Sequence, residues 1–317
     1  MHRKAEPAPT RAWFVACCIV LMCVALALPT RAPQIVGGRA APLLLEHEPG
    51  EKHHGHYLLL TASVRRLTFA ELIWRQVSHV AATPTPGSMD ESREMAWSAV
   101  RDIVGSVLHV DAVALGSPAE RAGIEAGDQV ISVNGHDATE AEIDTALAGA
   151  RPLRLRIQRH TDVVDLELVA LPPWPQPRAG GMTLRRGPIS GPAPAVDTGS
   201  ASGSSGGLVL ALAELDLLTP GDLTGGTTVA ATGELGPGGF VGPVLGYDVK
   251  VRAALDAGAT AVLVPPEAAD HVRSLVPPGV RVFGVQRVSE AMWDLCGFGG
   301  TSSVCGNATS PAEGSGP

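Results

Sequence analysis

The chain has 317 residues, 45% hydrophobic and 18% charged, so it is long enough for two domains and too apolar for extended disorder. Its formal net charge is −8, and no basic cluster follows the first 11 positions, which argues against nucleic acid as the main partner. The three lysines are Lys4, Lys52 and Lys250. None follows a glycine-rich run with P-loop spacing, which excludes an ATPase motor of that type.

An uncharged run from Ala12 to Leu28 follows the basic N-terminal residues. Its length is at the lower limit for a membrane-spanning helix and just above that of a signal-peptide core. We predict a single-pass anchor over 12–29, with residues 1–11 in the cytoplasm and the rest of the chain outside the cell membrane. Cleavage as a signal peptide, after the small residues 25–27, is the alternative.

Residues 30–104 are predicted to form a stalk followed by a strand and helices. The stalk, 30–56, is rich in Pro, Gly and His, but His53, His54 and His56 have no acidic or cysteine partner in the pattern, so a solvated loop is favoured over a metal site. No metal or other cofactor is expected anywhere in the chain. Apolar spacing then predicts a strand over 57–63 and helices over 69–80 and 90–104.

From Gly105 the pattern changes to short apolar runs separated by turns. A tight turn is predicted at Asn134-Gly135. The elements expected are strands at 106–113, 130–133, 153–157 and 163–169, a short helix from about 118 and a helix at 141–148.

The segments Gly-Ser-Pro-Ala, Ala-Gly-Ile, Ala-Gly-Asp and Val-Asn-Gly, within 116–135, resemble a bacterial PDZ domain, which we place at 105–171. The resemblance implies a groove that binds an extended peptide as an added strand, including C-terminal tails of partner proteins. The carboxylate-binding loop expected near 103–107 is poorly matched, so the accepted peptide stays open. A packing module without a ligand is the alternative.

A proline-rich segment, 172–195, is predicted to be a linker without regular structure. After it, strands and helices alternate over 196–296, which predicts an α/β (α+β) domain followed by a flexible tail, 297–317. Cys296 and Cys305 either form a disulfide outside the cytoplasm or remain free thiols, and both alternatives stay open. The expected helices are 206–217, 249–255, 266–275 and 288–295, and the strands are 227–232, 240–244, 259–264 and 280–285.

The α/β segment holds a candidate serine–lysine pair. Ser205 precedes an apolar helix, whose N-terminus favours negative charge and the oxyanion of an acyl-transfer reaction. Lys250 begins another helix among apolar residues, and burial there lowers the pKa of its amine towards a proton acceptor. Taken singly, Ser205 as a helix N-cap and Lys250 as a solvated charge are the simpler readings. A Ser-His-Asp triad is disfavoured because His271 is the only histidine after position 160.

Five motifs in order resemble the proteolytic domain of Lon-type serine peptidases: Gly-Ser-Ser-Gly-Gly-Leu, Leu-Thr-Pro-Gly-Asp, Ala-Thr-Gly-Glu-Leu, Gly-Tyr-Asp-Val-Lys and Ala-Gly-Ala-Thr-Ala-Val. With the anchor and the PDZ domain, the chain resembles the membrane-anchored Lon-like proteases of actinobacteria. The resemblance implies that Ser205 is the nucleophile, Lys250 the general base and Thr232 the hydroxyl that orients the lysine. Ser204 replaces the proline usual before the serine, and Gly206 an alanine, so Ser204 is the alternative nucleophile.

The expected function is therefore an ATP-independent serine endopeptidase that acts on peptides or proteins outside the membrane, with the PDZ domain recruiting or gating substrate. The alternative is a weak or inactive adaptor that binds peptide tails and scaffolds membrane-protein complexes. Asp197 is a minor candidate for tuning the lysine. Related domains form rings, so self-assembly of the chain is also expected.

Overall fold

The computed structural model describes residues 19–25, 27–45, 56–68, 88–149, 151–170, 177–199 and 203–305. The chain forms two compact units, residues 1–37 with 62–85 and residues 38–61 with 86–317. Among the described residues, no helix has the length and apolar character needed to cross a membrane. Residues 12–18 and 26 of the predicted anchor, the helix predicted at 69–80, and His53 and His54 lie outside the described ranges.

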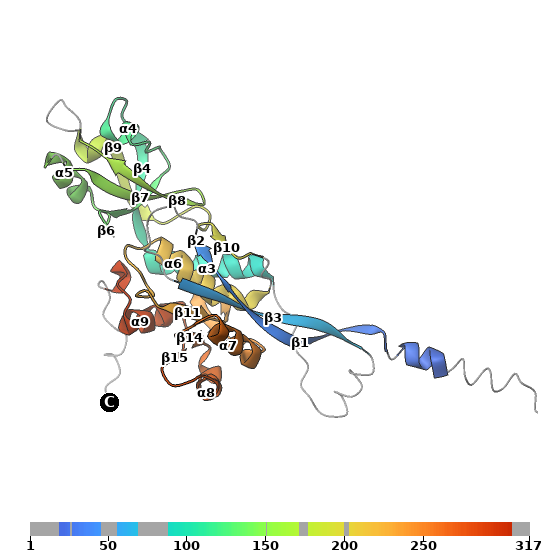
Figure 1. The fold of residues 1–317 in the computed structure, drawn as a ribbon. Helices are drawn as coiled ribbons and strands as arrows, with labels where there is room; N and C mark the ends of the chain where they lie inside the picture. The colour runs from blue at the N-terminus through green and yellow to red at the C-terminus, as the bar shows by residue number, and fades with distance from the viewer. Residues whose placement is uncertain are drawn as a thin grey trace, which may run out of the picture. The chain divides into compact units, whose positions relative to one another are not determined.

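The first unit contains, among its described residues, a short helix at 19–25 and parts of two strands, β1 (Pro29–Pro42) and β3 (His56–Thr68). The same strands continue into the second unit, where they belong to a five-stranded sheet in the order β1-β3-β11-β14-β15 (Figure 1). Strands β3, β11, β14 and β15 are parallel, with Tyr57 opposite Val229. The remaining strands are β11 (Thr228–Ala231), β14 (Ala261–Val264) and β15 (Arg281–Gly284).

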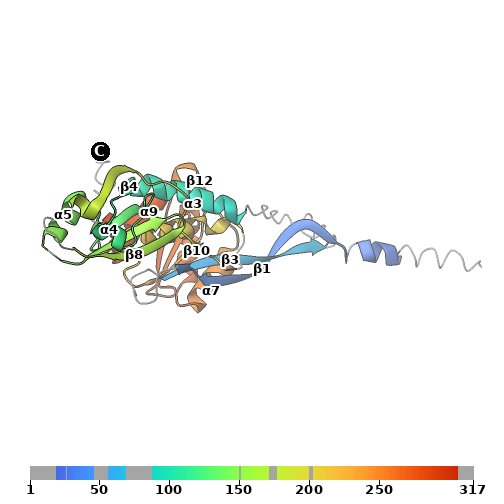
Figure 2. The ribbon, with the colours of Figure 1, turned by 90° about the horizontal axis from the view of Figure 1, so that it is seen from above.

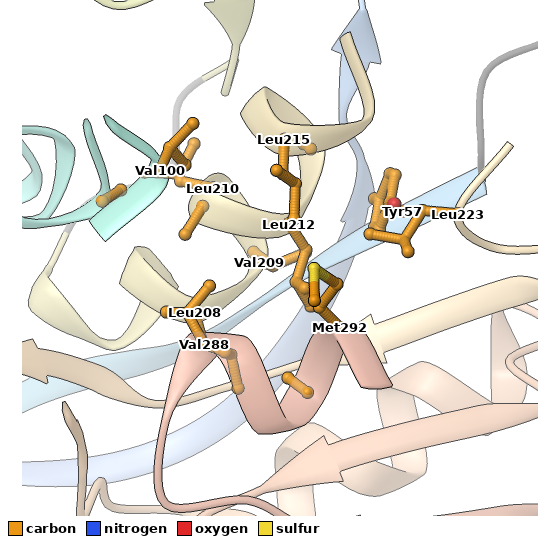
Figure 3. Close-up of a cluster of buried hydrophobic side chains, with 14 of the residues drawn as sticks. Tyr57, Val100, Leu208, Val209, Leu210, Leu212, Leu215, Leu223, Val288 and Met292 are labelled. Carbon is orange, nitrogen blue, oxygen red and sulfur yellow. The ribbon is translucent and has the colours of Figure 1, made fainter. Parts of the chain in front are cut away.

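Helices cover both faces of this sheet. Successive side chains of a strand point to opposite faces, so neighbouring strand residues belong to two different cores. Leu59 and Leu263 belong to the core shared with α3, α6 and α9, whereas Leu58 and Val262 belong to the core shared with α7 and α8. Figure 3 shows the first core, where side chains of α6 lie close to Val100 and Met292. The helices are α3 (Met89–Val104), α6 (Gly207–Leu217), α7 (Tyr247–Asp256), α8 (Pro266–Leu275) and α9 (Val288–Phe298).

A second, antiparallel sheet has the order β8-β7-β5-β4-β9, with β6 paired to β5. The predicted strands and the turn are confirmed: Asn134 and Gly135 both have positive φ, 52° and 78°. The elements are β4 (Ser106–Val113), α4 (Pro118–Arg121), β5 (Gln129–Val133), β6 (His136–Asp137), α5 (Glu140–Ala148), β7 (Leu153–Arg159), β8 (Asp162–Leu168) and β9 (Met182–Pro188).

Two predicted irregular segments contain strands, so those predictions are wrong. Within the predicted linker, 172–195, β9 pairs with β4 and completes the second sheet. Within the predicted stalk, 30–56, residues up to Pro42 belong to β1. Because β1 is an edge strand, the prolines that argued against regular structure are compatible with it.

The second sheet is an insertion in the chain of the α/β fold. Strand β3 and helix α3 precede it, and the rest of the α/β fold follows it. The sequence predicted that residues 196–296 form the α/β domain by themselves. That prediction is incomplete, because β1, β3 and α3 also belong to it. Two short antiparallel pairs complete the strands: β2 (Leu44–Leu45) with β10 (Val196–Asp197), and β12 (Glu234–Gly236) with β13 (Phe240–Gly242).

The two C-terminal cysteines are bonded, which decides between the alternatives left by the sequence. Cys296 at the end of α9 and Cys305 in a short 3-10 helix, Ser303–Cys305, form a disulfide with a Cα–Cα distance of 5.4 Å. The closed loop also bonds to the turn after α6, where Ser303 N donates to Pro220 O at 2.7 Å. Residues 301–305 are thereby held against the α/β fold.

Candidate active site and peptide-binding edge

Ser205 lies in a 3-10 turn, Ser204–Gly206, that leads directly into α6. The N-cap of α6 is Gly206, without a side-chain capping bond, so the simpler reading of Ser205 as the N-cap is wrong. The predicted location of Ser205 at the N-terminal end of this helix is confirmed. The N-terminal end of this 11-residue helix favours negative charge, so it would stabilise an oxyanion formed there.

The backbone carbonyl of Ser205 is held by the end of strand β11. It accepts hydrogen bonds from Thr232 Oγ1 at 3.1 Å and from Gly233 N at 3.0 Å. Thr232 N in turn donates to Leu263 O at 3.1 Å, and its side chain is fully buried. The central sheet thus positions both the threonine hydroxyl and the serine backbone.

Lys250 reaches the same hydroxyl from helix α7. Its Nζ donates to Thr232 Oγ1 at 3.0 Å, and the residue is 2% exposed, so the simpler reading as a solvated surface charge is wrong. Burial lowers the pKa of the amine from 10.5 to about 8. The Thr232 hydroxyl gives its single proton to Ser205 O, so its lone pairs orient the lysine.

These contacts bring Ser205, Thr232 and Lys250 together, although the three lie far apart in the chain. The buried amine is available as a proton acceptor at mildly alkaline pH, and Thr232 connects it to the backbone of a serine at a helix N-terminus. A proton acceptor, a hydroxyl nucleophile and a site for negative charge are the requirements of acyl transfer.

The minor candidates make other contacts. Asp197 Oδ1 accepts the Gly199 N–H at 2.7 Å in a local turn. His271 Nε2 pairs with Asp248 Oδ1 at 3.0 Å, and both side chains are more than half exposed. In the described part of the chain, these contacts give neither residue a bond to Ser205 or Lys250.

In the second sheet, the edge strands are β8 and β9. Residues 103 and 104 form the end of α3, and 106 and 107 begin β4, which has β5 and β9 on its two sides. The carboxylate-binding loop expected near 103–107 is therefore not there. Strand β9 is paired on one side within the described sheet. The opposite side of β9 is an edge to which an extended peptide can add.

The turn before β9, Arg178–Gly181, has the left-handed backbone typical of anion-binding nests, with φ of 46°, 66° and 92° at its last three residues. Two of its amides have partners within the domain. Ala179 N donates to Asp144 Oδ1 of α5 at 2.6 Å, and Gly180 N donates to Pro177 O at 3.1 Å. A carboxylate of the chain itself therefore accepts one of the N–H groups of this turn.

Sequence reasoning missed this turn and strand. The signal was present: a Gly-Gly pair followed by alternating apolar and polar residues, Met182 to Leu184, indicates a turn and a strand. The many prolines before it concealed the pattern.

Comparison with protein families finds a PDZ domain at residues 109–159. The match lies within the second sheet and confirms the predicted PDZ region. The match ends before β9, a strand that the structure shows to belong to the same sheet. A search of the curated proteins finds no match.

Proposed function

We propose that the chain is an ATP-independent serine endopeptidase in which Ser205 is the nucleophile, Lys250 the general base and Thr232 the orienting hydroxyl. The observation that carries the proposal is the buried Lys250 amine, bonded to a hydroxyl that also holds the Ser205 backbone. The Lon-type motifs at the same residues support it. In this proposal the chain is anchored through 12–29, self-assembles and acts outside the membrane.

The neutral amine of Lys250 takes the proton of Ser205 Oγ as that oxygen attacks the substrate carbonyl carbon. The carbonyl oxygen becomes an oxyanion beside the N-terminus of α6. The lysine ammonium then gives its proton to the leaving amine, the C–N bond breaks, and an acyl-enzyme forms. Attack by water, with Lys250 again accepting the proton, releases the acid and restores Ser205.

The test is cleavage of unfolded casein by the full chain at pH 9, followed by reaction with a β-lactone that acylates nucleophilic serines. We expect cleavage, and mass spectrometry of tryptic peptides is expected to locate the acyl group on Ser205. An adduct on Ser204 instead would overturn the assignment of the nucleophile. A folded chain that neither cleaves nor acylates contradicts the peptidase proposal.

The cleavage rate should rise with pH. Because burial lowers the pKa of Lys250 to about 8, kcat/KM should increase through pH 8, with a rate at pH 7 about one-tenth of the plateau. Glu214 supplies the control, because burial raises the pKa of its carboxyl to about 8 as well. Glu214→Gln should keep the same dependence of kcat/KM on pH. A flat profile between pH 6.5 and 9.5 in the wild type is inconsistent with this role of Lys250.

The second candidate function is a peptide-binding adaptor, which the PDZ match and the free edge of β9 favour. It differs from the first in needing neither Ser205 nor Lys250. Both functions require binding of an extended segment beside β9, which can be measured without cleavage.

Because Asp144 accepts the N–H of Ala179, we expect the PDZ domain to bind peptide amides about as well as free acids, within about threefold. Asp144→Asn removes the negative charge and should shift the preference towards free acids. The measurement is capture of two random decapeptide pools, one with free C-termini and one amidated, by the full chain with Lys250→Ala. A wild-type preference for free acids above about tenfold speaks against an occupied turn.

A further inference from the structure

Helix α3 contacts the segment of chain that leads to Ser205. Arg93 Nη2 donates to Val196 O at 3.0 Å and to Thr198 Oγ1 at 3.2 Å. One turn further along the same helix, Trp97 Nε1 donates to Gly191 O at 2.9 Å. We call residues 190–198 the entry segment.

The entry segment is also held from the PDZ sheet. Buried Gln129 of β5 donates through Nε2 to Ser190 O at 2.8 Å, and buried Gln158 of β7 donates to Pro192 O at 2.9 Å. These bonds fix the beginning of the entry segment. Arg93 fixes the end of the entry segment through Val196 and Thr198, two buried residues just before the loop that carries Ser205.

The loop is therefore held on both sides of the serine. Downstream, Thr232 and Gly233 hold the Ser205 carbonyl. Upstream, the bonds of Arg93 to Val196 and Thr198 are the last contacts of an α3 side chain with the segment before Gly203 among the described residues. Three residues of the loop, 199–206, are glycines (Gly199, Gly203 and Gly206), whose backbone is conformationally permissive. The position of Ser205 therefore depends on the hydrogen bonds that hold the chain before and after the loop.

A buried carboxylate on the helix that follows Ser205 lies within electrostatic reach of Arg93. Glu214 lies on α6, is 1% exposed, and its Oε2 has no hydrogen-bond partner within the structure described. Burial raises the pKa of this carboxyl, and the positive charge of Arg93 opposes the rise, so the two side chains lie within electrostatic reach. Arg93 thus bonds to the entry segment, and its charge lies near a buried carboxyl of α6.

We propose that Arg93 is a positioning residue that sets the location of Ser205 by anchoring the entry segment against α3. This inference rests on the proposed peptidase function. It assigns a role in the site to a helix that precedes the PDZ insertion in the chain.

The test compares Arg93→Met and Arg93→Lys with Arg101→Met in the full chain. Arg101 is the matched control, since it lies on the same helix and its guanidinium is stacked over Trp97, 5.8 Å from the ring centroid. For cleavage of a fluorogenic casein peptide, Arg93→Met should lower kcat about tenfold with KM nearly unchanged, because small displacements of a reacting group are costly. Arg93→Lys should recover part of the loss, and Arg101→Met should retain wild-type kcat.

Hydrogen–deuterium exchange supplies a readout that does not need activity. Peptides covering residues 196–207 should exchange faster in Arg93→Met than in Arg101→Met, at equal melting temperature. Unchanged exchange together with unchanged kcat would overturn the positioning role. If the wild type does not cleave, the peptidase proposal fails on its own, and exchange alone then decides the role of Arg93.

Discussion

Lys250→Met is expected to remove casein cleavage, lowering the rate by about 10²–10⁴-fold, the usual contribution of a general base. Methionine fills a similar volume but has no amine to accept the Ser205 proton. The control is Arg252→Met, an exposed neighbour on α7, which should cleave like the wild type. Cleavage by Lys250→Met within about threefold of wild type shows that another group is the base.

The same substitution is expected to stabilise the fold at pH 7. The pKa of Lys250 falls from 10.5 in its ordinary state to about 8 in the folded chain, so between these values the unfolded chain binds more protons and stability rises with pH. Below pH 8 the charged buried amine costs about 3 kcal/mol. Loss of the bond to Thr232 offsets about 1 kcal/mol of that gain.

Denaturant unfolding at pH 7 and pH 10 measures this effect. Lys250→Met should exceed the wild type by roughly 2 kcal/mol at pH 7, and the difference should shrink as the pH rises towards 10.5. A variant less stable than wild type at pH 7 contradicts a destabilising buried charge. Greater stability with lost activity is the exchange expected at an active site.

Gly38→Ala is expected to lower cleavage by up to about 10²-fold, because a displacement of about 1 Å at a catalytic group can cost that much. A Cβ at Gly38 would lie 2.2 Å from Val249 O and 3.0 Å from Lys250 N, which are backbone atoms of the first turn of α7. Strand β1 passes beside α7 in both views (Figures 1 and 2). Either β1 or the turn that carries Lys250 must move.

Gly37→Ala is the matched control, since a Cβ there meets no atom within 4 Å in the described structure. Cleavage and melting temperature are measured for both variants. We expect Gly37→Ala to behave like the wild type and Gly38→Ala to lose activity and about 1–3 kcal/mol of stability, as overpacking does. Equal activity of the two variants would show that β1 yields without moving Lys250.

Much of the fold could be predicted from local patterns. Helical spacing located α3, α8 and α9, and alternation with Asn134-Gly135 located the strands of the PDZ sheet, because these signals depend on residues near each other in the chain. Strands β1 and β9 were missed because they are sheet edges. Their regular structure depends on pairing with β3 and β4, which proline-rich sequences do not reveal.

The candidate site divides in the same way. The sequence by itself determined the candidates: Ser205 and Lys250 stand out as a serine before an apolar helix and an isolated lysine, and the resemblance to Lon-type peptidases adds Thr232. Only the tertiary structure decided that Lys250 is buried, that Thr232 joins it to the Ser205 backbone, and that Gly38 and Arg93 lie against the elements that hold them. Burial, and the pKa it lowers, arise from atoms contributed by distant parts of the chain, which no local pattern specifies.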